Sequence, residues 1–283
     1  MKLPTALVLL LIGTGLLWAP GLQRQAEAGA WTRPRRRTWV KTSFMFQETE
    51  ERYFLDGNRI PYFFEGHNRT AAGFFDISRG LTDRLEVRLQ LPFWTITFND
   101  LADNRTSTGI GDIRVGVRYN LAQAPLVATI GSTVKFPTGE FINDAETIPV
   151  GEGQYDVEVT AELGRSLWPR PGYVTGLMGY RFRTQNGETG IDFGDELIWS
   201  VEGGYHIAPR LMVKGLLRGL HGFDSTSFGL NIDSLRREIV YFEPGALFEL
   251  NPSRGIEFSL PITLRGRNWP AGLVFNIGFY QEF

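Results

Sequence analysis

The sequence predicts an all-β membrane protein: a transmembrane antiparallel up-and-down β-barrel of about twelve strands, preceded by a cleavable signal peptide. Three observations lead to this prediction. Apolar and polar residues alternate with a period of two through almost all of the chain after Arg37. The connections between the alternating segments are short and long in turn. The chain begins with a basic residue and an apolar stretch of the kind that directs export.

The first segment has the three parts of a signal peptide. Lys2 supplies a positive charge, Ala6 to Trp18 forms an apolar core, and Ala26-Glu27-Ala28 offers the small residues that signal peptidase needs. Residues 1–28 are therefore expected to be removed by cleavage after Ala28, with cleavage after Ala30 as the alternative.

The mature chain divides into two parts. Residues 29–37 are expected to form a basic N-terminal segment on the periplasmic side, and residues 38–283 to form the barrel. We expect this segment to be a solvated basic tail. The alternative is that its arginines bind lipid phosphates. The basic residues in question are Arg33, Arg35, Arg36 and Arg37.

The alternation is clearest from Arg84 to Phe98. Leu85, Val87 and Leu89 share one face there, whereas Glu86 and Arg88 share the other. The spacings of three and four that mark a helix are absent. The twelve expected strands are approximately 38–48, 70–79, 84–98, 109–121, 125–137, 153–165, 172–184, 193–206, 211–222, 236–250, 255–265 and 271–283.

The apolar face points to a membrane rather than to a soluble sandwich. It is nearly free of charge over about ten residues per strand, which is the height of a tilted membrane strand. Lipid satisfies no backbone groups, so open sheet edges are forbidden and the sheet must close. Mean hydropathy is only −0.14, as expected if half of each strand faces a polar lumen.

Aromatic residues near the strand ends are expected to form two interfacial girdles. The girdle on the short-turn side comprises Trp39, Trp168, Tyr173 and Tyr205, and the girdle on the other side comprises Phe98, Phe136, Tyr155 and Trp269. Both termini fall on the short-turn side, which is periplasmic in barrels of the Gram-negative outer membrane. The final residue, Phe283, ends an alternating strand and resembles the signal read by the barrel-assembly machinery.

Composition excludes several classes of protein. The chain has no cysteine, so it can hold neither a disulfide nor a thiolate metal site. Its net charge of −2 gives no reason to expect a nucleic-acid partner. Outer-membrane lipid is the expected partner, and a small-molecule solute is a further candidate.

Four short segments carry a family resemblance. Thr108–Tyr119 (TGIGDIRVGVRY) and Val134–Glu140 (VKFPTGE) resemble the outer-membrane family named for the meta pathway of phenol degradation. Gly80–Val87 (GLTDRLEV) and Gly151–Val157 (GEGQYDV) are similar to hairpins of the same family. The resemblance implies a barrel and a role in passing small hydrophobic or aromatic compounds, and it brings no catalytic residues.

Strand parity turns equal numbers of basic and acidic residues toward the lumen. The basic residues are Lys41, Arg84, Arg88, Arg114, Arg118, Lys135, Arg181, Arg183, Lys214, Arg218 and Arg265. The acidic residues are Asp76, Glu86, Asp112, Asp156, Glu158, Glu162, Glu196, Glu202, Glu243, Glu249 and Glu257. Fifteen of these residues form the candidate lumen-lining site. They are Arg84, Arg88, Asp112, Arg114, Arg118, Lys135, Asp156, Glu158, Arg181, Arg183, Glu196, Glu202, Lys214, Arg218 and Glu243.

The balance of signs favours a ladder of ion pairs between neighbouring strands over a charge-selective pore. The turn at Ala122–Ala124 is expected to place Asp112 opposite Lys135. A turn centred between Trp168 and Pro169 is expected to place Asp156 opposite Arg181.

Three functions remain open: a passive channel or uptake porin, a hydrolase at the extracellular rim, and a closed structural barrel. A hydrolase would use His221 or His67 as the base, with Asp224, Ser225 and Ser227 near the former. Parity turns His221 outward, however, and the spacing is not diagnostic. We therefore expect no enzyme, no cofactor and no metal site.

Overall fold

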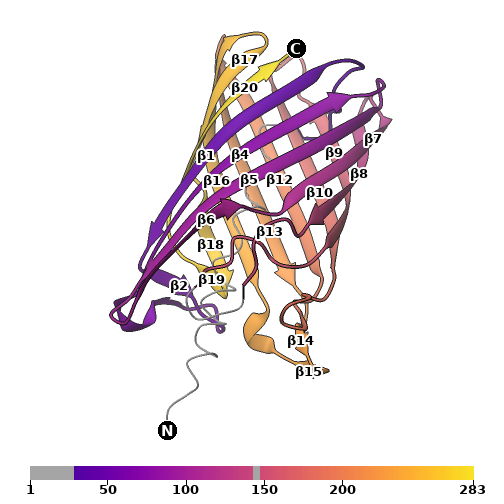
Figure 1. Ribbon diagram of the computed structural model, residues 1–283. Coiled ribbons are helices and arrows are strands. Elements are labelled where there is room, and N and C mark those ends of the chain that lie inside the picture. The colour runs from indigo at the N-terminus through magenta and orange to yellow at the C-terminus, as the bar shows by residue number, and fades with distance from the viewer. Residues whose placement is uncertain (1–28, 143–146) are drawn as a thin grey trace.

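The computed structural model describes residues 29–142 and 147–283. The predicted signal peptide, residues 1–28, lies outside the described residues. Strands inclined to a common axis close into a barrel, with the C-terminus at the end that carries the short turns and β2, β14, β15 and β19 at the opposite end (Figure 1). Within the described residues, no helix is long and apolar enough to cross a membrane.

The wall is a closed antiparallel barrel of 12 strands, as predicted. Ten wall positions are single strands, namely β1 (Thr38–Thr49), β4 (His67–Gly80), β5 (Leu85–Asn99), β8 (Val127–Phe136), β9 (Asp156–Ser166), β10 (Gly172–Arg183), β12 (Glu196–Ala208), β13 (Leu211–Gly222), β16 (Glu238–Asn251) and β20 (Val274–Glu282). Each of the other two positions holds a broken strand. These are β6 (Asn104–Ile110) with β7 (Ile113–Ala122), and β17 (Arg254–Ser259) with β18 (Ile262–Arg267). The pairs β1–β20 and β13–β16 complete the ring.

The long loops carry small elements of their own. β2 (Glu51–Tyr53), β3 (Arg59–Pro61) and β19 (Trp269–Pro270) form one short sheet. A second sheet comprises β11 (Ile191–Asp192), β14 (Thr226–Ser227) and β15 (Leu230–Asn231). Two 3-10 turns, η2 (Phe63–Glu65) and η3 (Asp233–Leu235), lie at the same end. This end is extracellular if the short turns face the periplasm.

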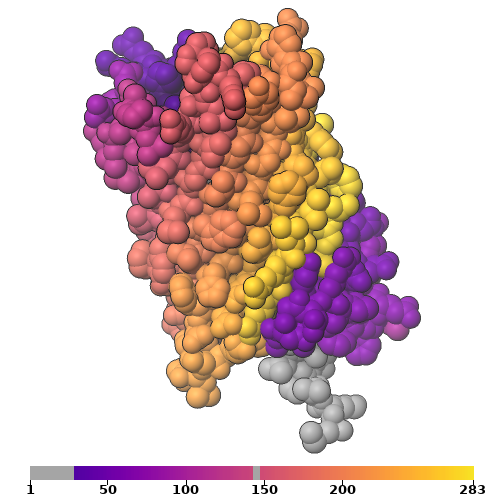
Figure 2. Space-filling model, turned by 180° about the vertical axis from the view of Figure 1, so that it is seen from behind, coloured from indigo at the N-terminus to yellow at the C-terminus, as the bar shows by residue number. Residues whose placement is uncertain are grey.

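The two faces of the wall differ as the alternation predicts. Outward side chains are large, apolar and exposed: Phe44 is 60% exposed, Met178 60% and Ile277 52%. The C-terminal strands, orange to yellow, run obliquely across this outer surface (Figure 2). Inward charged side chains such as Glu158 and Lys135 are 2% exposed. Because a soluble monomer rarely exposes so large an apolar surface, this belt is the lipid-facing one.

Two of the predicted registers were wrong by two residues. Lys135 lies opposite Arg114 rather than Asp112, because the turn is wider than expected: Ala122 pairs with Ala128, and a bulge between Asn120 and Ala122 then shifts the β7–β8 pairing by one residue. Asp156 lies opposite Arg183 rather than Arg181. There, Ser166 pairs with Tyr173, so the turn is centred one residue later than expected. A two-residue shift keeps each side chain on its predicted face.

The parity prediction also failed at Arg265. β17 ends at Ser259 and β18 begins at Ile262, and the pairing with β16 shifts between Val240 and Tyr241. Arg265 therefore lies opposite outward-facing Val240, and its side chain is 76% exposed. The break in the strand turns this arginine out of the lumen.

Four of the predicted girdle aromatics lie inside the barrel instead. Trp39 is 3% exposed, Phe98 1% and Trp269 4%, and Tyr173 shares the inward row of β10 with Thr175. The other four remain exposed at the strand ends: Trp168, Tyr205, Phe136 and Tyr155. Phe98 and Trp269 join an interior apolar cluster with Met45, Phe74, Trp94, Ile96, Ile148, Val150, Leu220, Ile239 and Tyr241.

Candidate permeation pathway

A dense ionic cluster lies inside the barrel toward the long-loop end. Lys135 Nζ lies 3.0 Å from an Asp156 carboxylate oxygen and 3.3 Å from one of Asp112. Arg183 continues the cluster, 3.6 Å from Asp156 and 3.3 Å from Glu196. All five side chains are almost completely buried. Charges this deep in a protein are stable only when paired, and here each has a partner of opposite sign.

Two members of this cluster come from loops, and sequence reasoning missed both. Glu152 pairs with Lys135 and lies 3.2 Å from Arg183. Arg237 lies 3.1 Å from Glu152 and 2.6 Å from Glu196. Burial and the neighbouring Arg183 cation lower the pKa of Arg237, and the carboxylates of Glu196 and Glu152 offset part of this. Arginine is effectively always protonated in proteins, so the loops bring one charge of each sign into the long-loop end of the lumen.

Pairs of opposite charge continue along the inner face of the wall. Arg181 pairs with Glu196 and lies 3.1 Å from Glu158. Further pairs toward the short-turn end include Arg114–Glu158 at 3.9 Å, Arg118–Glu162 at 2.6 Å, Arg118–Glu86 at 3.3 Å, Arg88–Glu86 at 2.8 Å, Lys41–Glu257 at 2.6 Å, Arg218–Glu243 at 3.2 Å and Lys214 with Glu257. Glu202 accepts a hydrogen bond from the Tyr173 hydroxyl at 2.5 Å.

Of the fifteen candidate lumen-lining residues, only Arg84 is exposed to solvent. It lies in the turn before β5, which begins at Leu85. The structure places the other fourteen inside the barrel. They are Arg88, Asp112, Arg114, Arg118, Lys135, Asp156, Glu158, Arg181, Arg183, Glu196, Glu202, Lys214, Arg218 and Glu243.

The N-terminal segment enters the barrel from the short-turn end. Arg118 donates hydrogen bonds to the backbone carbonyls of Gly29 and Trp31, and Thr129 donates to that of Ala30. Ala30 is completely buried, and the Trp31 ring meets Tyr173 edge-on with centroids 6.1 Å apart. Residues 29–31 thus narrow the lumen at this end, which the sequence did not predict.

The arginines of this segment fall into two groups. Arg35, Arg36 and Arg37 are exposed, which fits both a solvated tail and the alternative of contact with lipid phosphates. Arg33 is not solvated, because its backbone N–H donates to Glu86 at 2.7 Å and its guanidinium lies 5.4 Å above the Trp39 ring. Arg33 therefore fastens the segment to the inner wall.

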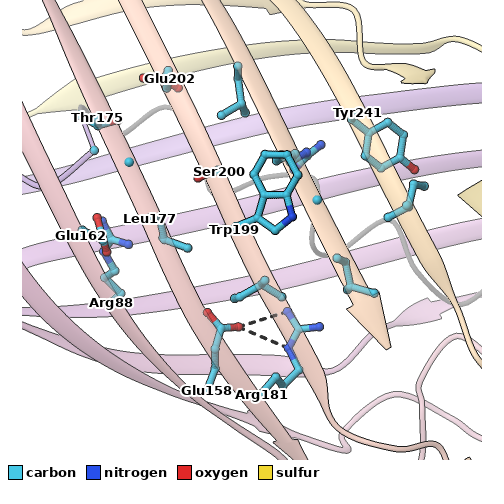
Figure 3. Close-up of a pocket in the computed structure, with 18 of the residues that line it drawn as sticks. Arg88, Glu158, Glu162, Thr175, Leu177, Arg181, Trp199, Ser200, Glu202 and Tyr241 are labelled. Atoms are coloured by element: carbon cyan, nitrogen blue, oxygen red, sulfur yellow. Dashed lines mark hydrogen bonds and ion pairs between the residues drawn. The ribbon is translucent and has the colours of Figure 1, made fainter. Parts of the chain in front are cut away.

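A cavity of about 130 Å³ lies between the N-terminal segment and the ionic cluster (Figure 3). Gly29 lies at its short-turn side, and the Arg181–Glu158 pair borders it, joined by dashed lines in the figure. Its apolar lining includes Leu177, Ile198, Leu216, Leu220, Ile239 and Tyr241. Its charged lining includes Arg88, Glu158, Glu162, Arg181, Glu202 and Arg218. The cavity is therefore amphipathic.

A family model described as "Putative MetA-pathway of phenol degradation" matches residues 54–279. The chain belongs to this family. The match spans most of the barrel wall and includes all the strands that line the cavity. It bears out the resemblance carried by the Gly-rich segments of the sequence. No curated protein sequence matches the chain.

Solved structures with the same fold are also outer-membrane barrels. The COG4313 outer membrane channel from Pseudomonas putida F1 has a TM-score of 0.78 at 19% identity, covering 90% of this chain and 98% of that one. The KdgM porin has a TM-score of 0.52 at 7% identity, covering 86% and 99%. The translocator domain of the autotransporter NalP from Neisseria meningitidis has a TM-score of 0.50 at 10% identity, covering 93% and 91%.

The three histidines lie at the rims, each beside a glutamate. The His67–Glu48 distance is 3.0 Å, His206–Glu249 is 3.3 Å and His221–Glu238 is 3.4 Å. The Ser225 hydroxyl donates to the Phe193 carbonyl at 2.9 Å. Among the described residues, no group of three or more His, Asp or Glu side chains is placed to hold a metal ion.

Proposed function

We propose that the protein is a passive outer-membrane channel for small hydrophobic molecules, with single-ring aromatic compounds as the best fit. The observation that carries the proposal is the cavity of about 130 Å³ in the middle of the lumen. An engineered protein cavity of ~150 Å³ lined by leucine, isoleucine and phenylalanine accepts benzene. Here Leu177, Ile198, Leu216 and Leu220 offer a surface of the same kind.

The charges of the lumen support a neutral or weakly polar solute. Each buried cation that borders the cavity lies against a carboxylate, as in Arg181–Glu158 at 3.1 Å and Arg218–Glu243 at 3.2 Å. Paired charges leave little net field to attract one sign of ion. They also hold the wall rigid, so that the apolar side remains open to the solute.

The descriptions of the similar solved structures are consistent with a channel. The Pseudomonas putida protein is described as an outer membrane channel and KdgM as a porin. The family's description refers to phenol degradation, and phenol is a single-ring compound. These descriptions support a transport role, while the choice of solute rests on the cavity.

A hydrolase at the extracellular rim has less support. His221 points outward and lies against Glu238, and the hydroxyl of nearby Ser225 is committed to a backbone carbonyl. A general base must reach the nucleophile's proton. The channel proposal therefore includes no catalytic role for His221 or His67.

Export and assembly belong to the same proposal. Residues 1–28 have the composition of a cleaved signal peptide. Phe283, which is 62% exposed, directly follows β20 beside β1, and its backbone N–H donates to the Thr38 carbonyl. We propose that this terminal strand is recognised by the barrel-assembly machinery. Replacement of Phe283 with serine should then lower the amount of folded barrel in the membrane.

A matched pair of substitutions on β13 tests the channel. Leu216 lines the cavity and is 6% exposed, whereas neighbouring Leu217 faces lipid and is 36% exposed. Leu216→Trp should fill the cavity, and Leu217→Trp should leave it open. The measurement is uptake of a radiolabelled single-ring alcohol by intact cells that express equal amounts of folded barrel.

The proposal requires three results. The wild type raises uptake above cells without the protein, Leu216→Trp returns it to that background, and Leu217→Trp behaves as wild type. Background uptake by the wild type would favour a closed structural barrel. Unchanged uptake by Leu216→Trp would show that the solute does not use this cavity.

A further inference from the structure

Exposed charges are segregated between the two ends of the barrel. Within the described chain, the short-turn end exposes nine arginines and one acid, Asp83. The arginines are Arg35, Arg36, Arg37, Arg79, Arg84, Arg165, Arg170, Arg210 and Arg254. The described residues of the long-loop end expose nine acids, which are Glu48, Glu50, Asp56, Glu65, Asp103, Glu140, Glu188, Asp224 and Asp233. Within residues 29–142 and 147–283, only three exposed arginines, Arg59, Arg69 and Arg265, accompany them. We call the nine arginines of the short-turn end the arginine rim.

The guanidinium groups of the arginine rim have no acidic partners within the described residues, whereas the backbone N–H of Arg35 donates to the Asp83 carboxylate at 3.1 Å. None of the rim's nine guanidinium groups forms an ion pair there, and the Arg79 guanidinium donates only to the Thr38 hydroxyl at 3.1 Å. At the other end, all three exposed arginines have carboxylate partners: Arg69 lies 2.7 Å from Glu48, Arg265 lies 3.9 Å from Glu238, and Arg59 pairs with Glu51. The nine guanidinium groups therefore form a band of positive charge that no ion pair within the described residues neutralises.

Strand geometry places part of the rim at the level of the lipid boundary. Arg79, Arg165 and Arg254 pair with Val87, Val174 and Gln281, all on the outward face at the ends of their strands. Apolar side chains at the same end are also exposed, and they include Leu81 at 46%, Ile207 at 59%, Phe283 at 62% and Trp168 at 85%. Aromatic residues and long cationic side chains gather where acyl chains meet headgroups.

We propose that the arginine rim binds the phosphate headgroups of anionic phospholipids in the inner leaflet of the outer membrane. A guanidinium group matches a phosphate in charge and in its planar pair of donors. A lipid accounts for both parts of the surface, because its phosphate meets the arginines while its acyl chains meet Trp168 and Phe283. An acidic soluble protein would account for the charge alone. The proposal does not depend on what crosses the lumen.

Two triple variants with the same change of net charge test the proposal. Arg79→Gln/Arg165→Gln/Arg254→Gln removes cations from the arginine rim. Arg59→Gln/Arg69→Gln/Arg265→Gln removes exposed cations from the opposite end. Phosphatidylglycerol and phosphatidylethanolamine are titrated separately into each detergent-solubilised full barrel, and bound lipids are counted by native mass spectrometry. Separate arms replace the lipid with inorganic phosphate and with polyglutamate.

The wild type should bind phosphatidylglycerol more tightly than phosphatidylethanolamine. Each rim arginine removed should weaken phosphatidylglycerol binding by about fivefold, since one arginine near an anionic surface contributes on that scale. The opposite-end variant should match the wild type. Equal binding of the two lipids by the wild type, or equal losses in the two variants, would overturn the proposal. So would binding of polyglutamate or inorganic phosphate in preference to phosphatidylglycerol.

Discussion

The ammonium group of Lys135 lies 3.0 Å from the Asp156 carboxylate across β8 and β9, and both side chains are 2% exposed. Lys135→Met would leave Asp156 and Asp112 without their shared cation. Removing one partner from a buried ionic group costs about 3–5 kcal/mol. Urea unfolding in lipid vesicles should show a loss of this size. Arg265→Met, at an exposed pair, should cost no more than about 1 kcal/mol. Similar losses in both variants would contradict the buried network.

The outward face should reject charge more strongly than the lumen does. Val117 is 46% exposed on the lipid face of β7, whereas Ser200 lines the cavity. Val117→Arg should cost about 2–4 kcal/mol in a bilayer, because it places a cation in the hydrocarbon. Ser200→Arg should cost clearly less. The same unfolding titration measures both, and a larger loss for Ser200→Arg would reverse the assignment of the two faces.

The face on which most side chains lie was predictable, because the local alternation of apolar and polar residues determines it. The same signal cannot fix the register. A slip of one residue would turn charges into lipid, but a slip of two leaves every side chain on its own face. The two-residue errors at Asp112–Lys135 and Asp156–Arg181 are of this second kind. Both arose at turns, where a bulge or the position of the turn centre decides the pairing.

The rest of the lumen depends on segments that leave the wall and return inside it. Glu152 is a loop residue, and nothing in its neighbouring sequence shows that it enters the barrel. Arg237 directly precedes β16 and shares its parity with inward-facing Glu243, so the predicted strand 236–250 could have placed it inside. The entry of Gly29–Trp31 into the barrel depends on contacts with residues far away in the sequence. Trp39 is different, because it shares its parity with inward-facing Lys41 and could have been placed inside from the sequence. Its position near a strand end had suggested a membrane girdle instead.

Packing around Trp31 should hold the N-terminal segment inside. A Cβ atom added at Gly164 would lie 2.9 Å from the Trp31 ring, whereas the nearest atom to one added at outward-facing Gly176 is 3.9 Å away. Gly164→Val should therefore displace the segment, and Gly176→Val should not. The natural chain has no cysteine, so Ala30→Cys provides a single labelling site. Maleimide labelling of that cysteine should accelerate with Gly164→Val alone. Equal labelling rates in the two backgrounds would show that Trp31 does not pack against Gly164.

Conductance across a planar bilayer tests most directly whether the lumen is a continuous pathway narrowed by the N-terminal segment. The wild type and a variant lacking residues 29–33 are compared at the same salt concentration. The deletion removes the carbonyl groups bound by Arg118 and Thr129 and the Trp31 ring beside Tyr173. The account predicts discrete channels of small conductance for the wild type and clearly larger ones for the variant. Silent bilayers with both proteins, each shown to be folded, would contradict a pathway through this barrel.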